Sequence, residues 1–187
     1  MKNKTTLIIL VMALAVFLVG ASVLYKTLTE SIDADQLATE ATQETSAELT
    51  QAPDFIVYDI DGNEVKLSDF FGKPIVVNFW ASWCGPCKME MPDFQEKYLE
   101  LGEEVTFLMV NMTDGSRETV DISSAFIAEQ GYSFPVFYDT ASSAAITYSV
   151  YSLPTTFFID AQGNAVAQAT GAIDAATLQK GIDMICP

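Results

Sequence analysis

The chain has 187 residues and a formal net charge of −16 at pH 7, from 9 basic and 25 acidic residues, and it contains no histidine. The scarcity of basic residues argues against nucleic-acid binding. The lack of histidine excludes Ser-His-Asp and Cys-His nucleophile pairs, histidine-ligated zinc and histidine-ligated haem.

The N-terminus carries an apolar run from Leu7 to Leu24, preceded by Lys2 and Lys4. A helix over this run is just long enough to cross the hydrocarbon core of a bilayer. The two lysines should stay in the cytoplasm, which places the rest of the chain on the extracytoplasmic side of the cell membrane. Because Val19-Gly20-Ala21 would serve as a cleavage site, a removed signal peptide is the alternative. We expect residues 1–26 to form an uncleaved single-pass anchor.

Residues 27–52 hold six acidic residues, no basic residue and no aromatic residue. Such a segment cannot bury enough apolar surface to offset the entropy lost on ordering. We expect an acidic flexible linker here, followed by a folded domain over residues 53–187.

Strands and helices alternate in the predicted domain. The hydrophobic pattern predicts a hairpin over 55–67, buried strands over 74–81 and 105–111, and further strands over 134–139, 155–160 and 165–170. It predicts helices over 84–101, 116–131, 142–148 and 174–185, the last capped by Asp174. This order indicates an α/β fold with a mixed central sheet flanked by helices.

Cys84 and Cys87 form a Cys-x-x-Cys pair directly after the predicted strand 74–81. Structural zinc needs four ligands, and only Cys186 remains to join the pair. Covalent haem attachment needs a histidine after the second cysteine, where this chain has Lys88. A pair of inert buried cysteines is a further alternative, but such a pair would require neither Gly-Pro between the cysteines nor a helix that begins at the first of them. A redox dithiol remains, and we expect no metal and no other cofactor.

The predicted helix places Cys84 among the unpaired N–H groups of its first turn, which stabilise a thiolate. Cys87 follows nearly one turn later on the same face, so the two sulfurs can form a disulfide. Pro86 costs little there, because first-turn N–H groups have no intrahelical partner. We expect Cys84, at the exposed tip of the helix, to attack a substrate disulfide, and Cys87, which is turned toward the domain, to resolve the mixed disulfide. We expect Cys186 to be a free thiol after the last helix, with intermolecular pairing as the alternative.

The stretch "FWASWCGPCK" (79–88) resembles the thioredoxin active site. Together, "WCGPCKMEMP" and the distant "LPTTFFIDAQG" resemble the membrane-anchored TlpA/ResA-type thiol–disulfide oxidoreductases of the thioredoxin superfamily. The resemblance covers roughly residues 53–185. It implies a thioredoxin-like fold with a redox-active disulfide at the Cys-Gly-Pro-Cys motif.

The resemblance also implies residues that meet the substrate. Pro154 matches a cis-proline that lies against the cysteine pair, although an ordinary proline at a strand start is the alternative. Leu153 would then offer its backbone to an extended substrate. Trp83, Gly85 and Pro86 are expected to shape the surface around the attacking sulfur.

Glu90 matches an acidic residue characteristic of the TlpA/ResA branch. A carboxylate one turn from the cysteines could accept or donate a proton during exchange, and the alternative is a solvated residue on the helix surface. Asn78 stands where the similar thioredoxin strand has a buried aspartate. Because an asparagine cannot relay a proton, we expect Glu90 to carry that role.

These observations predict an extracytoplasmic, membrane-tethered thiol–disulfide oxidoreductase that acts as a protein-disulfide reductase. Its expected partners are an exported disulfide-containing protein and a membrane electron donor, and we expect a monomer. The resemblance is compatible with substrates from cytochrome c biogenesis, with oxidised surface proteins and with antioxidant methionine sulfoxide reductases. Two alternatives are a peroxiredoxin-like peroxidase and a haem- or metal-binding thiol chaperone without turnover.

Overall fold

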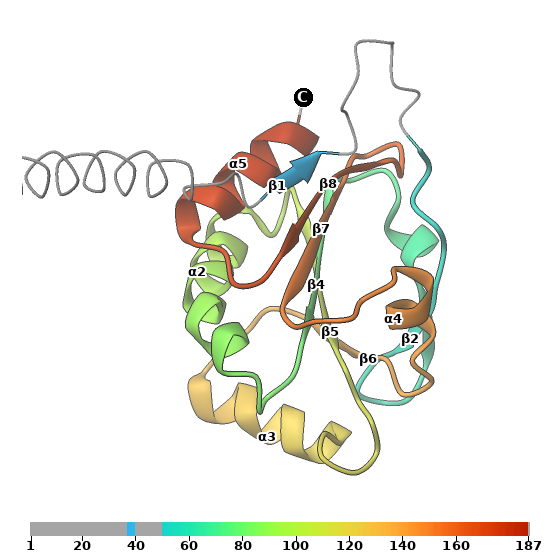
Figure 1. Ribbon diagram of the computed structural model, residues 1–187, viewed down its shortest axis with the longest axis vertical. Coiled ribbons are helices and arrows are strands. Elements are labelled where there is room, and N and C mark those ends of the chain that lie inside the picture. Colours follow the sequence, from blue (N-terminus) through green and yellow to red (C-terminus); the bar gives the residue numbers. More distant parts are fainter. Residues whose placement is uncertain (1–36, 40–49, 187) are drawn as a thin grey trace, which may run out of the picture. The chain divides into compact units, whose positions relative to one another are not determined.

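The computed structural model describes residues 37–39 and 50–186 (Figure 1). Its strands are β1 (Leu37–Thr39), β2 (Ile56–Tyr58), β3 (Glu64–Lys66), β4 (Ile75–Trp80), β5 (Thr106–Asn111), β6 (Val136–Tyr138), β7 (Thr155–Ile159) and β8 (Ala165–Thr170). Its helices are the 3₁₀ helix η1 (Leu67–Phe70) and the α-helices α2 (Gly85–Leu101), α3 (Val120–Gln130), α4 (Ser143–Thr147) and α5 (Ala175–Ile185).

The described strands form one mixed sheet in the order β1-β8-β7-β4-β5-β6-β2-β3. Strand β4 lies inside this sheet, parallel to β5 and antiparallel to β7. Strand β5 is also parallel to β6, while β8 is antiparallel to β7. The structure thus confirms the predicted α/β fold with a mixed central sheet flanked by helices.

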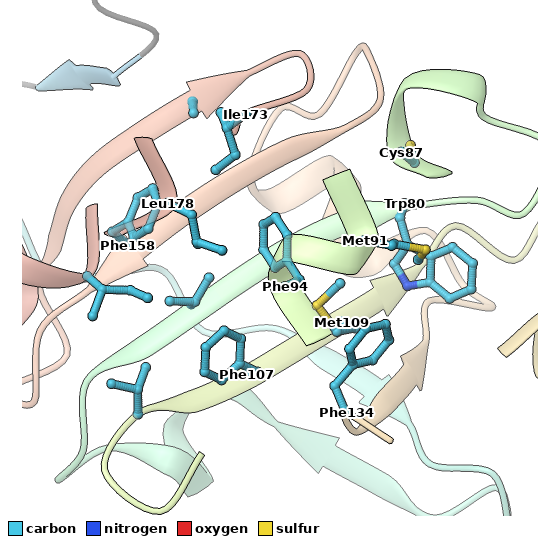
Figure 2. Close-up of a cluster of buried hydrophobic side chains, with 14 of the residues drawn as sticks. Trp80, Cys87, Met91, Phe94, Phe107, Met109, Phe134, Phe158, Ile173 and Leu178 are labelled. Atoms are coloured by element: carbon cyan, nitrogen blue, oxygen red, sulfur yellow. The ribbon is translucent and has the colours of Figure 1, made fainter. Parts of the chain in front are cut away.

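Both faces of the sheet are covered by apolar side chains. One face packs against α2, α3 and α5, and Figure 2 shows the core there, with the ring of Phe94 from α2 beside Leu178 from α5. The other face packs against α4 and η1 through a second cluster that includes Phe55 and Tyr148. Every residue of β4 is buried as a result, which confirms the prediction of a strand covered on both sides.

Alternation along β4 assigns its side chains to the two faces. Val76 and Trp80 join the cluster beneath α2 and α5, whereas Val77 and Phe79 join the opposite cluster. Asn78 is therefore turned toward α2, between two apolar neighbours of its own strand. This orientation determines which polar groups can form hydrogen bonds with Asn78.

The predicted elements agree with the structure to within a few residues, with one clear exception. Helix α3 begins at Val120, capped by Thr119, and not at residue 116. Residues 113–119 form a loop instead, because Asp114 Oδ1 accepts hydrogen bonds from the N–H groups of Ser116 and Glu118 and closes the chain on itself.

The boundary of the folded domain is also corrected. Residues 37–39, expected to lie in a flexible linker over 27–52, form β1 and pair with β8. Gln51 bridges Asn164, and the Ala52 N–H donates to the Gly163 carbonyl, so the domain includes residues before 53. The expected anchor over 1–26 lies outside the described residues. Within 37–39 and 50–186, no helix has the length and hydropathy that crossing a membrane requires.

Candidate active site

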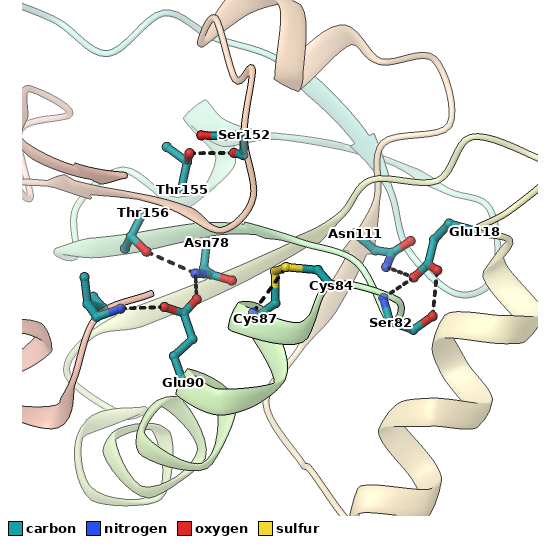
Figure 3. The surroundings of a disulfide bond; sticks show 11 residues. Asn78, Ser82, Cys84, Cys87, Glu90, Asn111, Glu118, Ser152, Thr155 and Thr156 are labelled. Carbon is teal, nitrogen blue, oxygen red and sulfur yellow. Dashed lines mark hydrogen bonds between the residues drawn. A yellow bond between two sulfur atoms is a disulfide. The ribbon is translucent and has the colours of Figure 1, made fainter. Parts of the chain in front are cut away.

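The cysteine pair lies where β4 ends and α2 begins (Figure 3). Cys84 is the N-cap residue of α2, and its Sγ accepts a hydrogen bond from the Cys87 N–H over 3.2 Å. The two sulfurs form a disulfide, with the Cα atoms 5.3 Å apart. An N–H of the first turn is thus aimed at the sulfur that the sequence predicts to attack.

The exposure of the two cysteines corrects one expectation. Cys87 is fully buried, and Cys84 is only 4% exposed, so the attacking sulfur does not protrude from the helix tip as predicted. The physical reason is that its side chain is bonded to Cys87 and joins the core cluster beneath α2. Of the two sulfurs, Cys84 remains the one that lines a surface groove.

That groove has three walls: residues 83–86, the loop after β5, and the segment 150–153. Trp83 is 40% exposed, and Gly85 and Pro86 lie beside it at the helix start. The bond between Leu153 and Pro154 is cis, as the resemblance implies, and Leu153 lines the groove. The structure therefore brings together the residues expected to meet a substrate, with Pro154 buried directly behind them.

Glu90 lies on the other side of the disulfide from the loop after β5, and it is 2% exposed (Figure 3). Its Oε1 accepts a hydrogen bond from Asn78 Nδ2 over 2.8 Å, and its Oε2 accepts one from the Ile173 N–H over 2.9 Å. Asn78 Nδ2 also donates to Thr156 Oγ1 over 3.0 Å. The alternative of a solvated helix residue is therefore wrong, because α5 and its preceding loop cover this part of α2.

Burial raises the pKa of Glu90 to about 7. The hydrogen bonds from Ile173 and Asn78 lower this pKa, and the negative charge of Asp93 raises it further, but burial dominates. A carboxyl group with this pKa exchanges its proton near neutral pH, which suits a general acid or base.

A second buried carboxylate, Glu118, was missed from the sequence. It is fully buried, and its oxygens accept hydrogen bonds from the Ser82 N–H (2.7 Å), the Ser82 hydroxyl (2.6 Å) and Asn111 Nδ2 (2.7 Å). Thr113 completes the cluster by donating to Asn111 Oδ1 over 2.8 Å. Glu118 thereby ties the ends of β4 and β5 together on the side of the disulfide opposite Glu90 (Figure 3).

One signal in the sequence could have revealed this cluster. Asn111 is the polar last residue of an apolar strand, and Ser82 follows the end of the neighbouring predicted strand. Since parallel strands end at the same edge of a sheet, these two side chains had to lie near each other. Glu118 itself was assigned to a helix, so its inward position was not foreseen.

The remaining predicted groups are placed as follows. Cys186 is free and partly buried at the end of α5. Burial raises the pKa of the Cys186 thiol, and Asp183 and Glu104 raise it further. In the part of the chain that the structure covers, no group of three or more cysteine, aspartate or glutamate side chains is arranged to hold a metal ion.

Comparisons with known proteins agree with this geometry. A model of the AhpC/TSA family matches residues 49–168. The thiol-disulfide oxidoreductase ResA of Bacillus thuringiensis subsp. konkukian is 35% identical over 140 residues, which cover 73% of this chain and 78% of the relative. The structure is similar to StoA from Bacillus subtilis (TM-score 0.61, 26% identity, 70% of this chain and 97% of the other). It is also similar to the pneumococcal exposed lipoprotein thioredoxin of Streptococcus pneumoniae (TM-score 0.59, 32% identity, 70% of this chain and 99% of the other).

The raised pKa of Glu90 predicts a specific loss of stability with pH. The unfolded chain releases this proton near the ordinary value of 4.5, whereas the folded protein holds it up to about 7. The contribution of Glu90 to stability is therefore greatest below pH 4.5, and it falls by up to roughly 3 kcal/mol as the pH rises to about 7. Denaturant unfolding of the oxidised protein at pH 5 and pH 8 should show this fall, and Glu90→Gln should lack it. Glu96→Gln, at an exposed position of the same helix, is the control and should show the same fall as wild type. Equal falls in the free energy of unfolding for wild type and Glu90→Gln would contradict the prediction.

Proposed function

The chain belongs to the AhpC/TSA family and is a thiol–disulfide oxidoreductase, and on this premise we propose that it reduces disulfides of exported proteins while tethered to the outer face of the cell membrane. The observation that carries the proposal is the Cys84–Cys87 disulfide at the start of α2, with Cys84 facing an open groove. A dithiol in this position can attack a protein disulfide that docks in the groove.

The reaction proceeds by two exchanges. In the reduced enzyme, the Cys84 thiolate attacks one sulfur of the substrate disulfide, forms a mixed disulfide and releases the other substrate sulfur as a thiolate, which takes up a proton. Cys87 then loses its proton and attacks the Cys84 sulfur. This step restores the disulfide seen in the structure and releases the second substrate thiol. The substrate gains two electrons and two protons, and the enzyme becomes oxidised.

We propose that Glu90 accepts and returns the proton of Cys87. The two residues are three positions apart on α2, so their side chains lie on the same side of the helix. With a pKa of about 7, the carboxylate can take the proton as Cys87 attacks and return it later. Asn78 can form a hydrogen bond with either form of Glu90. Its Nδ2 donates to the carboxylate, and after rotation of the amide its Oδ1 can accept from the carboxylic acid. This Oδ1 has no hydrogen-bond partner among the described residues.

The residues between the cysteines support the proposed reductive direction. Gly85 and Pro86 give the same dipeptide as thioredoxin, a reductant with a potential of about −270 mV, against about −120 mV for the oxidant DsbA. A reductant outside the membrane needs a supply of electrons. We propose a membrane protein with a dithiol as the donor: it reduces the Cys84–Cys87 disulfide by the same exchange and becomes oxidised itself.

The proposed location is supported by the N-terminal sequence. Lys2 and Lys4 precede the apolar run 7–24, which indicates a single-pass anchor with the folded domain outside. A structural relative with 32% identity is described as an exposed lipoprotein, and relatives are thiol–disulfide oxidoreductases of bacteria. Exported proteins with disulfides, including those of cytochrome c biogenesis and methionine sulfoxide reductases, are the proposed substrates of a monomeric enzyme.

Cysteine substitutions should separate the two exchanges. Cys84→Ser should abolish reduction of insulin disulfides, because no attacking thiolate remains. Cys87→Ser should stop after the first exchange and accumulate a one-to-one mixed disulfide, visible on a non-reducing gel. Cys186→Ser supplies the control, since this thiol lies at the end of α5, and it should retain full activity. Peroxide consumption by Cys87→Ser at the wild-type rate would support the peroxidase alternative and contradict the proposal.

The redox potential tests the direction independently. Equilibration of the Cys84–Cys87 couple with glutathione or dithiothreitol buffers should give a value below about −180 mV, on the reducing side of protein disulfide isomerase. A higher potential would overturn the reductase direction while leaving dithiol exchange intact.

The tether is tested with the full chain expressed in bacteria. Most of the protein should stay with membranes after a high-salt wash, and protease added to spheroplasts should digest the domain. Leu14→Arg places a charge at the centre of the apolar run, which costs about 2.5–3.5 kcal/mol on insertion scales, and should release the protein from the membrane fraction. A soluble protein whose mass corresponds to an N-terminus near Ser22 would instead show that a signal peptide had been cleaved.

A further inference from the structure

The loop after β5 presents a cation beside the reactive disulfide. Arg117 is exposed, lines the same groove as Cys84, and places its guanidinium carbon 3.9 Å from the centroid of the Trp83 ring. A guanidinium over an indole face is attracted electrostatically by the ring. This attraction uses none of the five N–H donors of the group, which stay available to a bound molecule.

Arg117 forms no ion pair within 4.0 Å in the described part of the chain, where the salt bridge present joins Lys97 to Glu100. Asp114 lines the groove too, and its Oδ1 accepts hydrogen bonds from the N–H groups of Ser116 and Glu118 in its own loop. The groove that Cys84 lines thus also displays a guanidinium without an ion-pair partner among the described residues.

The position of Arg117 is fixed from beneath by its sequence neighbour. Glu118 is fully buried and accepts three hydrogen bonds, two from Ser82 and one from Asn111. Figure 3 shows the contact between Glu118 and Ser82. Because Ser82 precedes Trp83 and Arg117 precedes Glu118, this contact joins the two backbone segments that carry the stacked pair. This buried contact fixes the backbone from which the guanidinium and the indole extend.

We propose that Arg117, positioned by Glu118, is a specificity-determining residue that binds a carboxylate side chain close to the disulfide of the substrate protein. The inference rests on the proposed disulfide reductase function and adds a preference within its substrates. The planar guanidinium matches a carboxylate in a charge-assisted pair of hydrogen bonds. Since the protein carries a net charge of −16, long-range forces do not favour acidic partners, and at about 0.15 M salt these forces are screened beyond about 8 Å. The local contact then decides the preference.

Matched peptides test this inference. Each peptide contains one internal disulfide, and the residue next to a cysteine is Glu, Gln or Lys. Binding to the oxidised protein is followed by tryptophan fluorescence, and reduction is followed in a single turnover of the reduced protein. Wild type should prefer the Glu peptide over the Gln peptide by about 3- to 10-fold in both measurements, and the Lys peptide should be the poorest.

Substitutions test whether Arg117 causes the preference for the Glu peptide. Arg117→Gln should bring the Glu-to-Gln ratio to about one, and Arg117→Lys should retain only part of it. Glu118→Gln places amide hydrogens against the donors of Ser82 and Asn111, and should also reduce the ratio. Lys88→Gln is the charge-matched control, because Lys88 is exposed at the start of the same helix but does not line the groove, and it should keep the wild-type ratio.

Two results would overturn the inference: equal binding of the Glu and Gln peptides by wild type, or a preference that survives in Arg117→Gln. The binding measurement keeps this test separate from the proposed function. If the protein binds the Glu peptide selectively but reduces none of the peptides, the reductase function fails and the carboxylate site stands.

Discussion

Strand β4 lies inside the sheet with both faces covered, and this burial determines the chemistry at its end. A polar side chain on such a strand cannot reach water, so it must find its hydrogen-bond partners inside the protein. Asn78 meets this requirement by donating to Glu90 and Thr156. The carboxylate of Glu90 is in turn held against the core, which raises its pKa to about 7. The raised pKa of Glu90, on which its proposed role in proton transfer depends, is thus a consequence of how the sheet is packed.

The disulfide lies between two buried carboxylates that have different surroundings. Glu90 accepts hydrogen bonds from Asn78 and Ile173, which join it to β4 and to the loop before α5. Glu118 accepts three hydrogen bonds from the edge where β4 and β5 end, and so fixes the groove wall that carries Arg117. In the proposed mechanism, Glu90 takes part in proton transfer with the cysteines, and Glu118 holds the proposed substrate surface. Both depend on strand ends that the sheet brings together.

Much of the fold could be predicted because it follows from local patterns. Apolar runs gave the buried strands, and Asp174 marked the start of α5, where its side chain accepts a hydrogen bond from the Thr177 N–H. The cysteine spacing gave the redox pair. What could not be predicted depends on contacts distant in sequence: Ile173 reaches Glu90 across 83 positions, and Ser82 reaches Glu118 across 36. Periodicity assigned Glu118 to a helix, because a buried carboxylate has no local signature.

A comparison of asparagine with aspartate at position 78 supports the proposed proton-transfer role of Glu90 on α2. A buried aspartate there would place a second negative charge within hydrogen-bond distance of Glu90, and each charge would make ionisation of the other more costly. The amide of Asn78 carries no charge, and its Nδ2 stabilises the ionised form of Glu90. When Glu90 takes up a proton, its hydroxyl needs an acceptor, which the unpaired Oδ1 of Asn78 can supply after rotation, with Thr156 donating to the same oxygen. A neutral side chain that can both donate and accept therefore lets a single carboxyl group titrate beside the cysteines.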